Sequence, residues 1–186
     1  TEPDPTIGLT KITEGFATGA ATKVQVYSTS SSILTGYTRF YLALTDSASG
    51  NRIDKAQIEL LPMMDMGTMK HTSPFENPES TTAINHLFPA NVVFIMPSMG
   101  GSWTVSFKIK NLVNGKEGSL TIPVTVAEGT KPAIKSFVDA NDGSKYFVAL
   151  VEPSKPKVGI NDLELAIYKK VSMMSFPADS SLTVQF

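Results

Sequence analysis

Apolar and polar residues alternate with a period of two along most of this chain. The alternation is regular in residues 23–27, 57–60, 103–109 and 119–126, and looser in residues 39–44. Successive side chains of a β-strand point to opposite faces, so this period predicts strands with one buried face. No segment of ten or more residues follows the 3.6-residue period of a helix. We therefore expect an all-β fold.

Turn-forming residues separate the alternating segments, at residues 46–51, Gly100-Gly101 and Asn114-Gly115. An Asn-Gly step between two such segments is a strong hairpin signal. Strands are expected at residues 7–13, 21–28, 37–45, 56–62, 90–96, 102–110 and 117–126. Seven short strands within about 125 residues are typical of an immunoglobulin-like β-sandwich. We expect Trp103, the only tryptophan, in its core.

Residues 92–95 break the alternation, because Val92, Val93, Phe94 and Ile95 follow one another without a polar residue. A continuous apolar run of this length is typical of a strand that is buried on both faces. We therefore expect residues 92–95 to lie in a strand that is buried on both faces.

The second half of the chain repeats the pattern of the first. Gly36-Tyr-Thr-Arg-Phe-Tyr-Leu-Ala-Leu44 aligns without a gap on Gly159-Ile-Asn-Asp-Leu-Glu-Leu-Ala-Ile167. Shorter matches begin at Lys23 and Lys145, and at Ala56 and Leu182, so the offsets are 122, 123 and 126 residues. We expect a tandem repeat, with a first sandwich at residues 1–129 and the N-terminal half of a second at residues 132–186.

The second copy is expected to be incomplete in this chain, because Phe186 corresponds to Leu60 of the first copy. Half a sandwich has unpaired strand edges and an open apolar face, and it is unstable alone. Either the natural protein continues beyond Phe186 or residues 132–186 pack on the first domain. We favour continuation.

Composition narrows the possible partners. The chain is 41% hydrophobic and 18% charged, with a formal net charge of −1. That balance suits a globular core and gives no electrostatic footprint for nucleic acid or an anionic membrane surface. The chain has no cysteine, which fits export to an oxidising compartment. A lipoprotein with its anchoring cysteine upstream of Thr1 is one origin consistent with these features.

Common catalytic motifs do not occur in the sequence. It has no cysteine nucleophile, no Gly-x-Ser-x-Gly and no P-loop, and neither histidine has a triad-like context. Asp139-Ala-Asn-Asp-Gly143 is better explained as a turn than as a calcium loop, because no glutamate follows at EF-hand spacing. We therefore expect a protein that is not an enzyme.

All eight methionines fall in three short clusters. The first lies in the methionine-rich loop 62–78 and includes His71, the second is in residues 95–101, and the third is Met173-Met174. Methionine thioethers are soft neutral ligands that select Cu(I), and imidazole suits either oxidation state of copper. The candidate metal ligands are Met63, Met64, Met66, Met69, His71, Met96 and Met99.

Other interpretations of these residues stay open. The loop is also consistent with an apolar cap over the end of the sandwich, or with a plastic surface that binds a partner. Met173 and Met174 are expected to be core packing, and His86 a surface or satisfied polar histidine.

These motifs resemble the YtkA-like family of exported immunoglobulin-like domains. The resemblance rests on Pro62-Met-Met-Asp-Met-Gly-Thr-Met-Lys-His71 followed by Pro74 and Pro78, on Val93-Phe-Ile-Met-Pro-Ser-Met99, and on Gly101-Ser-Trp103. It covers residues 36–126 and again 145–186. The tandem methionine-rich form is similar to lipoproteins of Bacteroidetes-type bacteria. The chain departs from the family pattern at Lys70-His-Thr-Ser73, where a more histidine-rich tail is usual, so the number of ligands stays open.

The resemblance implies copper handling or a place in an envelope assembly. The leading hypothesis is an exported protein of the periplasm or cell surface, such as an outer-membrane lipoprotein, that captures or relays Cu(I). The alternative is a structural or accessory module that docks on an outer-membrane transporter or other envelope complex. An adhesin-like spacer is a third hypothesis.

Overall fold

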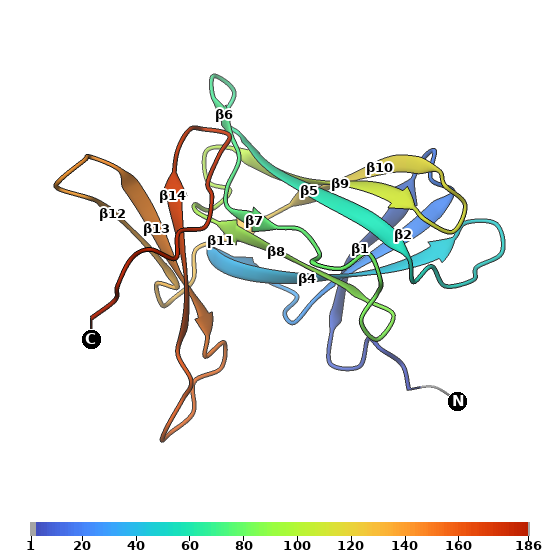
Figure 1. Ribbon diagram of the computed structural model, residues 1–186, viewed down its shortest axis with the longest axis horizontal. Coiled ribbons are helices and arrows are strands. Elements are labelled where there is room, and N and C mark those ends of the chain that lie inside the picture. Colours follow the sequence, from blue (N-terminus) through green and yellow to red (C-terminus); the bar gives the residue numbers. More distant parts are fainter. Residues whose placement is uncertain (1–2, 186) are drawn as a thin grey trace.

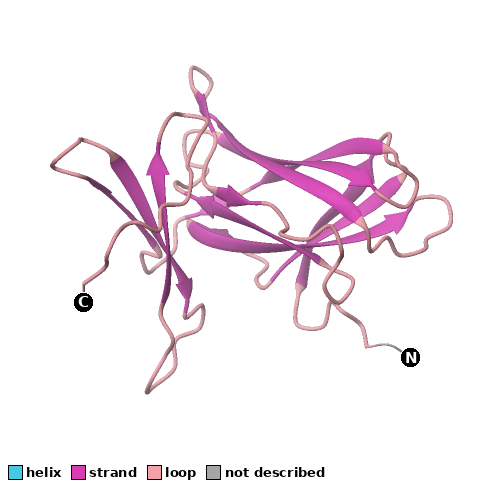
Figure 2. Cartoon of the chain, in the orientation of Figure 1, coloured by secondary structure: helices cyan, strands magenta, loops and turns pink. Residues whose placement is uncertain are grey.

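The computed structural model describes residues 3–185, which form strands and connecting loops (Figures 1 and 2). The expected all-β class is confirmed. Within these residues there is no helix long and apolar enough to cross a membrane.

Two antiparallel sheets pack face to face and form a β-sandwich (Figure 1). The first sheet has the order β1-β2-β4-β8-β7, with β1 Thr10–Ala17, β2 Thr22–Ser28, β4 Gly36–Asp46, β8 Phe88–Phe94 and β7 Phe75–Glu76. The second has the order β10-β9-β5-β6, with β10 Glu117–Val124, β9 Ser102–Asn111, β5 Ala56–Asp65 and β6 Lys70–His71. A short parallel pair, β3 Ile33–Leu34 and β11 Val126–Ala127, joins the strand ends.

The alternating residues form the core between the two sheets. In β4, Phe40, Leu42 and Leu44 point inward, and in β9 the inward residues include Phe107 and Ile109. Trp103 is 1% exposed, as expected for a core residue. Period-two patterning therefore fixes which face of each strand is buried.

Each of the seven expected strands overlaps an observed one. The largest difference is at the first, which begins at Thr10 because residues 4–9 form turns with Gly8 at a φ of 83°. The expected hairpin at Asn114-Gly115 is confirmed, since Glu117 of β10 pairs with Lys110 of β9 across it.

The last part of the chain forms a third sheet that packs on the outside of the sandwich. It has the order β12-β13-β14, with β12 Ile134–Val138, β13 Lys145–Glu152 and β14 Glu164–Lys170. Ala149 and Tyr168 of this sheet pack against Val93 of β8. The described residues of the second half therefore pack on the first domain, and continuation beyond Phe186 stays a prediction.

Strand β8 is buried on both faces, as its continuous apolar run predicts. Val92 and Phe94 face the sandwich core, whereas Val93, which is 1% exposed, faces the third sheet. The third sheet is therefore the neighbour that explains the apolar residue between two core positions.

Glu76 fastens the third sheet to the sandwich. Its carboxylate accepts hydrogen bonds from Tyr168 Oη at 2.8 Å, Tyr37 Oη at 2.8 Å and Asn91 Nδ2 at 2.9 Å. Burial raises the pKa of Tyr168 and that of Tyr37 well above the usual value, and the hydrogen bond to Glu76 is the second cause. Arg39 adds an ion pair with Glu152 at 3.3 Å.

The third sheet has the same strand order and direction as β1-β2-β4, which the repeat predicts. Residues 182–185, which the repeat aligns with the start of β5, form no strand, and Phe186 lies outside the described residues. The tandem repeat stays a prediction.

Candidate functional site

The methionine-rich loop lies at one end of the sandwich, where β5 turns into β6 (Figure 1). We call residues 62–73 and 95–102 the methionine end. Its first part is a hairpin with Gly67 at a φ of 81° and a backbone hydrogen bond from Met66 N to Met69 O of 2.9 Å. The interaction with Lys70 lowers the pKa of Asp65 below its usual value, and the hydrogen bond from the Gly67 amide adds to this effect. The carboxylate therefore stays ionised beside the hairpin.

Met64 and His71 are direct partners across the β5–β6 pairing. Met64 is fully buried and His71 is 6% exposed, so both side chains are in the interior at the methionine end. Partners opposite each other in an antiparallel pair lie on the same face of the sheet, about 5 Å apart at Cβ. A thioether and an imidazole are therefore neighbours here.

Trp103 of β9 contacts both members of this pair. It is the partner of Met64 on β9, and its ring lies edge-on to His71 with 5.6 Å between centroids. Its indole Nε1 donates to the carbonyl of Met96 at 3.0 Å. That bond holds the backbone of Met96, in the second methionine cluster, beside Trp103.

The hydrogen bonding of His71 leaves one ring nitrogen uncommitted. Nδ1 lies 2.7 Å from the carbonyl of Thr72, which can only accept, so Nδ1 carries the proton. In the neutral imidazole the other nitrogen, Nε2, then has the lone pair, and within residues 3–185 it has no hydrogen-bond partner. A metal-binding histidine commonly has this arrangement, with one nitrogen fixed by a carbonyl and the other on the metal.

A second polar atom near His71 is also unpaired. The hydroxyl of Ser73 is fully buried without a hydrogen-bond partner in the described part of the chain, whereas Thr72 Oγ1 donates to Pro62 O at 2.6 Å. Buried polar groups without a partner are rare in folded proteins. The segment 71–73 therefore offers uncommitted polar atoms inside the methionine end.

The β8–β9 loop lies directly against Met64. A Cβ atom on Gly101 would be 2.7 Å from Met64 Cε and 2.6 Å from Asp65 O. Met96 is half-buried, but Met99 is 82% exposed. The structure thus brings Met96 and Met64 to the same region and places Met99 at its rim.

The remaining expected ligands lie further out. Met63 points to the opposite face of β5 from Met64, so the structure does not bring it together with His71. Met66 and Met69, at the hairpin tip, are 39% and 49% exposed. Met66 lies beyond the end of β5. Although it is two residues from Met64, strand alternation therefore does not place both sulfurs on one face of the strand.

Sequence reasoning missed one contact of this end. The amide of Thr72 donates to the carbonyl of Met173 at 2.9 Å, so the third methionine cluster touches the segment next to His71. The two stretches are a hundred residues apart in the chain, and the position of the third sheet brings them together. No local signal could have indicated it.

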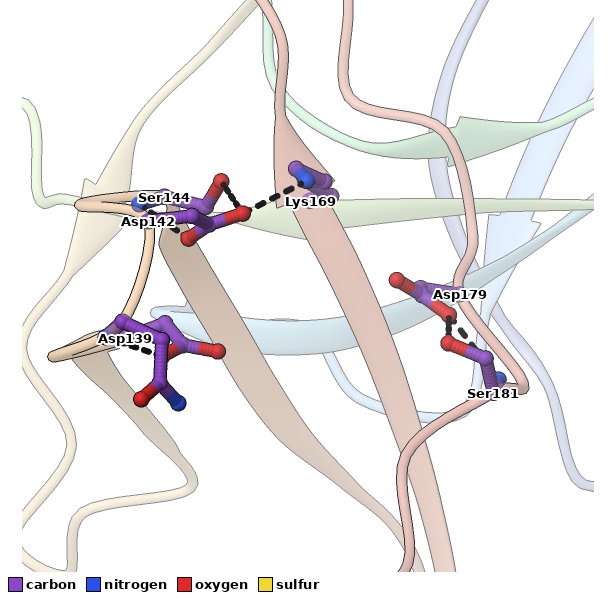
Figure 3. Close-up of polar contacts among 7 residues, drawn as sticks. Asp139, Asp142, Ser144, Lys169, Asp179 and Ser181 are labelled. Atoms are coloured by element: carbon purple, nitrogen blue, oxygen red, sulfur yellow. Dashed lines mark hydrogen bonds and ion pairs between the residues drawn. The ribbon is translucent and has the colours of Figure 1, made fainter.

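Other charged groups form turns and ion pairs. His86 Nδ1 lies 2.8 Å from Asp54 Oδ2, as expected for a satisfied polar histidine. The expected turn at residues 139–143 is confirmed: Asp139 accepts from the Asn141 amide, while Asp142 binds Ser144 and Lys169 (Figure 3). Among residues 3–185 no three His, Cys, Asp or Glu side chains are grouped to hold a metal. A methionine-based site is a separate case, because its main donors are thioethers.

Comparisons of this chain with protein-family models, with curated proteins and with solved structures found no match. The resemblance to the YtkA-like family stays a prediction.

Proposed function

We propose that this protein binds Cu(I) at the methionine end, through the Met64 thioether and the Nε2 atom of His71. The observation that supports this most strongly is the buried Met64–His71 pair, in which Thr72 fixes the imidazole by its other nitrogen. A thioether and a neutral imidazole are both ligands that Cu(I) accepts. Neither has to lose a proton to bind when Nε2 already carries the lone pair.

Further donors come from the methionines around this pair. Met96 packs against the core cluster that contains Met64, and its carbonyl accepts a hydrogen bond from Trp103. Met66, Met69 and Met99 line the outside of the same end, where exposed thioethers offer a first contact for an incoming ion. Their exposure supports binding over plain packing, since gap-filling methionines are normally buried.

The proposed setting is a non-enzymatic, exported protein of the periplasm or cell surface, which an upstream lipid anchor would hold at the outer membrane. The absence of cysteine and the use of thioethers support it, because a thiolate site risks disulfide formation in an oxidising compartment. We assign the sandwich to the immunoglobulin-like class, and the third sheet to the first half of a second copy.

The test is an anaerobic titration of the purified chain with Cu(I) against a chromophoric chelator. Met64→Leu is the informative variant, because exchange of methionine for leucine conserves volume and usually costs less than about 1.5 kcal/mol of stability. Met63→Leu, on the opposite face of the same strand, is its matched control. We expect one Cu(I) per chain in the wild type and in Met63→Leu, and affinity weakened by more than about tenfold in Met64→Leu. A wild-type chain that fails to compete for Cu(I) would contradict the proposal.

Partner docking is the second candidate function, and the exposed methionines of this end favour it. Met99, Met69 and Met66 present flexible apolar side chains to solvent, which suits a surface that adapts to a partner such as an outer-membrane transporter or other envelope complex. Replacing these three residues with serine separates the two functions. Loss of assembly with Cu(I) affinity unchanged would support docking, and the converse would support copper binding.

A further inference from the structure

The turn after β14 carries Met173 and Met174 to the methionine end. Ser172 and Ser175 pair across this turn, and Met174 N donates to Ser172 Oγ at 3.1 Å. Figure 1 shows the turn rising beside the β5–β6 hairpin, and the bond from Thr72 N to Met173 O is the contact between them. The last turn of the third sheet therefore contacts the methionine end through the backbone of Met173.

This turn is firmly anchored on both sides. Before it, Tyr168 is 2% exposed and donates to Glu76. After it, Phe176 packs edge-on against Phe147, with 5.8 Å between ring centroids. Lys169 N also donates to Pro177 O at 2.9 Å, which closes the base of the turn. The turn is thus held to the third sheet, and Tyr168 joins that sheet to the sandwich.

The backbone of Met173 contacts the residue that follows His71. Its carbonyl contacts Thr72, and the Cα atoms of Thr72 and His71 are about 3.8 Å apart, as in any trans peptide. A methionine side chain has three rotatable bonds, so its sulfur can approach the segment from several directions. Met173 is half-buried and Met174 is 51% exposed, so Met174 in particular is not a core residue.

We infer that Met173 and Met174 are thioether donors of the same Cu(I) site, so that the bound ion joins the third sheet to the sandwich. This inference rests on the proposed function and extends it to a second part of the chain. All three methionine clusters of the sequence then contribute ligands to the same Cu(I) site. It replaces the expectation of core packing for this pair with a binding role.

The experiment is NMR of the whole chain labelled with 13C at the methionine methyl groups and titrated with Ag(I). Ag(I) is a soft monovalent cation that stands in for Cu(I) without oxidising, and each of the eight methyl signals is assigned by a Met→Leu variant. We expect the signals of Met64, Met173 and Met174 to shift together and to saturate at the same ratio of metal to protein. Met63 serves as the internal control, whose signal stays in place.

The outcomes separate the inference from the function on which it rests. Shifts at Met64 without shifts at Met173 and Met174 would overturn the inference and leave the proposed function standing. No shift at any methionine would overturn both. A double variant, Met173→Leu with Met174→Leu, adds an affinity measurement, in which we expect Cu(I) binding weakened by more than about tenfold. Affinity equal to that of Met63→Leu would also overturn the inference.

Discussion

Of the two glycines in the β8–β9 loop, Gly101 is the one at which an added side chain would contact the proposed site. A Cβ there would meet the backbone oxygen of Asp65 at 2.6 Å and the end of the Met64 side chain at 2.7 Å. The backbone contact cannot be relieved by a rotamer change, so the loop itself must shift. We expect Gly101→Ala to lower the free energy of unfolding by about 1–3 kcal/mol and to weaken Cu(I) binding.

Urea denaturation of Gly101→Ala beside Gly15→Ala checks this expectation. At Gly15 the closest atom to an added Cβ is the tip of the flexible Leu120 side chain, at 2.7 Å, so relief is easy there. Equal stability losses in the two variants would show that the loop does not press on Met64 as described.

Neighbouring methionines in the sequence have opposite surroundings. Met63 and Met64 differ by one position, and strand alternation sends one to each face of β5. Sequence reasoning could name both as candidates from residue type. It could not separate them, because the run through Pro62-Met63-Met64 contains no polar residue that would mark the outer face of the strand.

At the scale of elements, the hydrogen bonds between β4, β7 and β14 make stability sensitive to alkaline pH. Burial beside Glu76 raises the pKa of Tyr168, so the folded protein holds its phenolic proton after the unfolded chain, with a tyrosine pKa of about 10, has released it. The contribution of Tyr168 is therefore complete below about pH 10 and is lost as pH rises further, by up to about 1.4 kcal/mol per pH unit.

Denaturation of the wild type and of Tyr168→Phe between about pH 8 and pH 11 measures this contribution. We expect the stability of the variant to fall less steeply with pH, because it lacks this proton. Tyr41→Phe, on β4 of the first sheet and without a hydrogen bond to Glu76, is the control. Parallel curves for wild type and Tyr168→Phe would refute the assignment.

The sequence predicted those elements whose stability comes from alternation. Strands β2, β4, β9 and β10 are regular because their apolar residues recur at every second position and one face is buried. The two-residue strands β3, β6, β7 and β11 carry no period, since tertiary contacts hold them. Strand β12 was missed because apolar and polar residues do not alternate in Ile134-Lys-Ser-Phe-Val138.

At the scale of the whole molecule, two adjacent valines report on two different interfaces. Val92 faces the sandwich core and Val93 faces the third sheet, and each is at most 1% exposed. Truncation to alanine at either position removes buried methyl groups and is expected to cost about 1–3 kcal/mol. We expect Val93→Ala to speed hydrogen exchange in β13 and β14 while β9 stays protected.

Val92→Ala should show the converse pattern, with faster exchange in the sandwich strands. Identical exchange profiles for the two variants would mean that the sandwich and third sheet unfold as one unit. That result would contradict the account of β8 as a strand between two separate interfaces.

The arrangement of the third sheet was the least predictable feature. In β13 the run from Tyr146 to Val151 is apolar on both faces, so the pattern cannot say which face meets the sandwich. Sequence reasoning therefore found the methionine end but not Met173, which reaches it only through this docking.

X-ray absorption at the copper edge of the Cu(I)-loaded chain tests the central claim most directly. We expect thioether sulfur together with a single imidazole around the copper, and a loss of sulfur scattering in Met64→Leu but not in Met63→Leu. A spectrum with only nitrogen and oxygen neighbours, or one that Met64→Leu leaves unchanged, would contradict it.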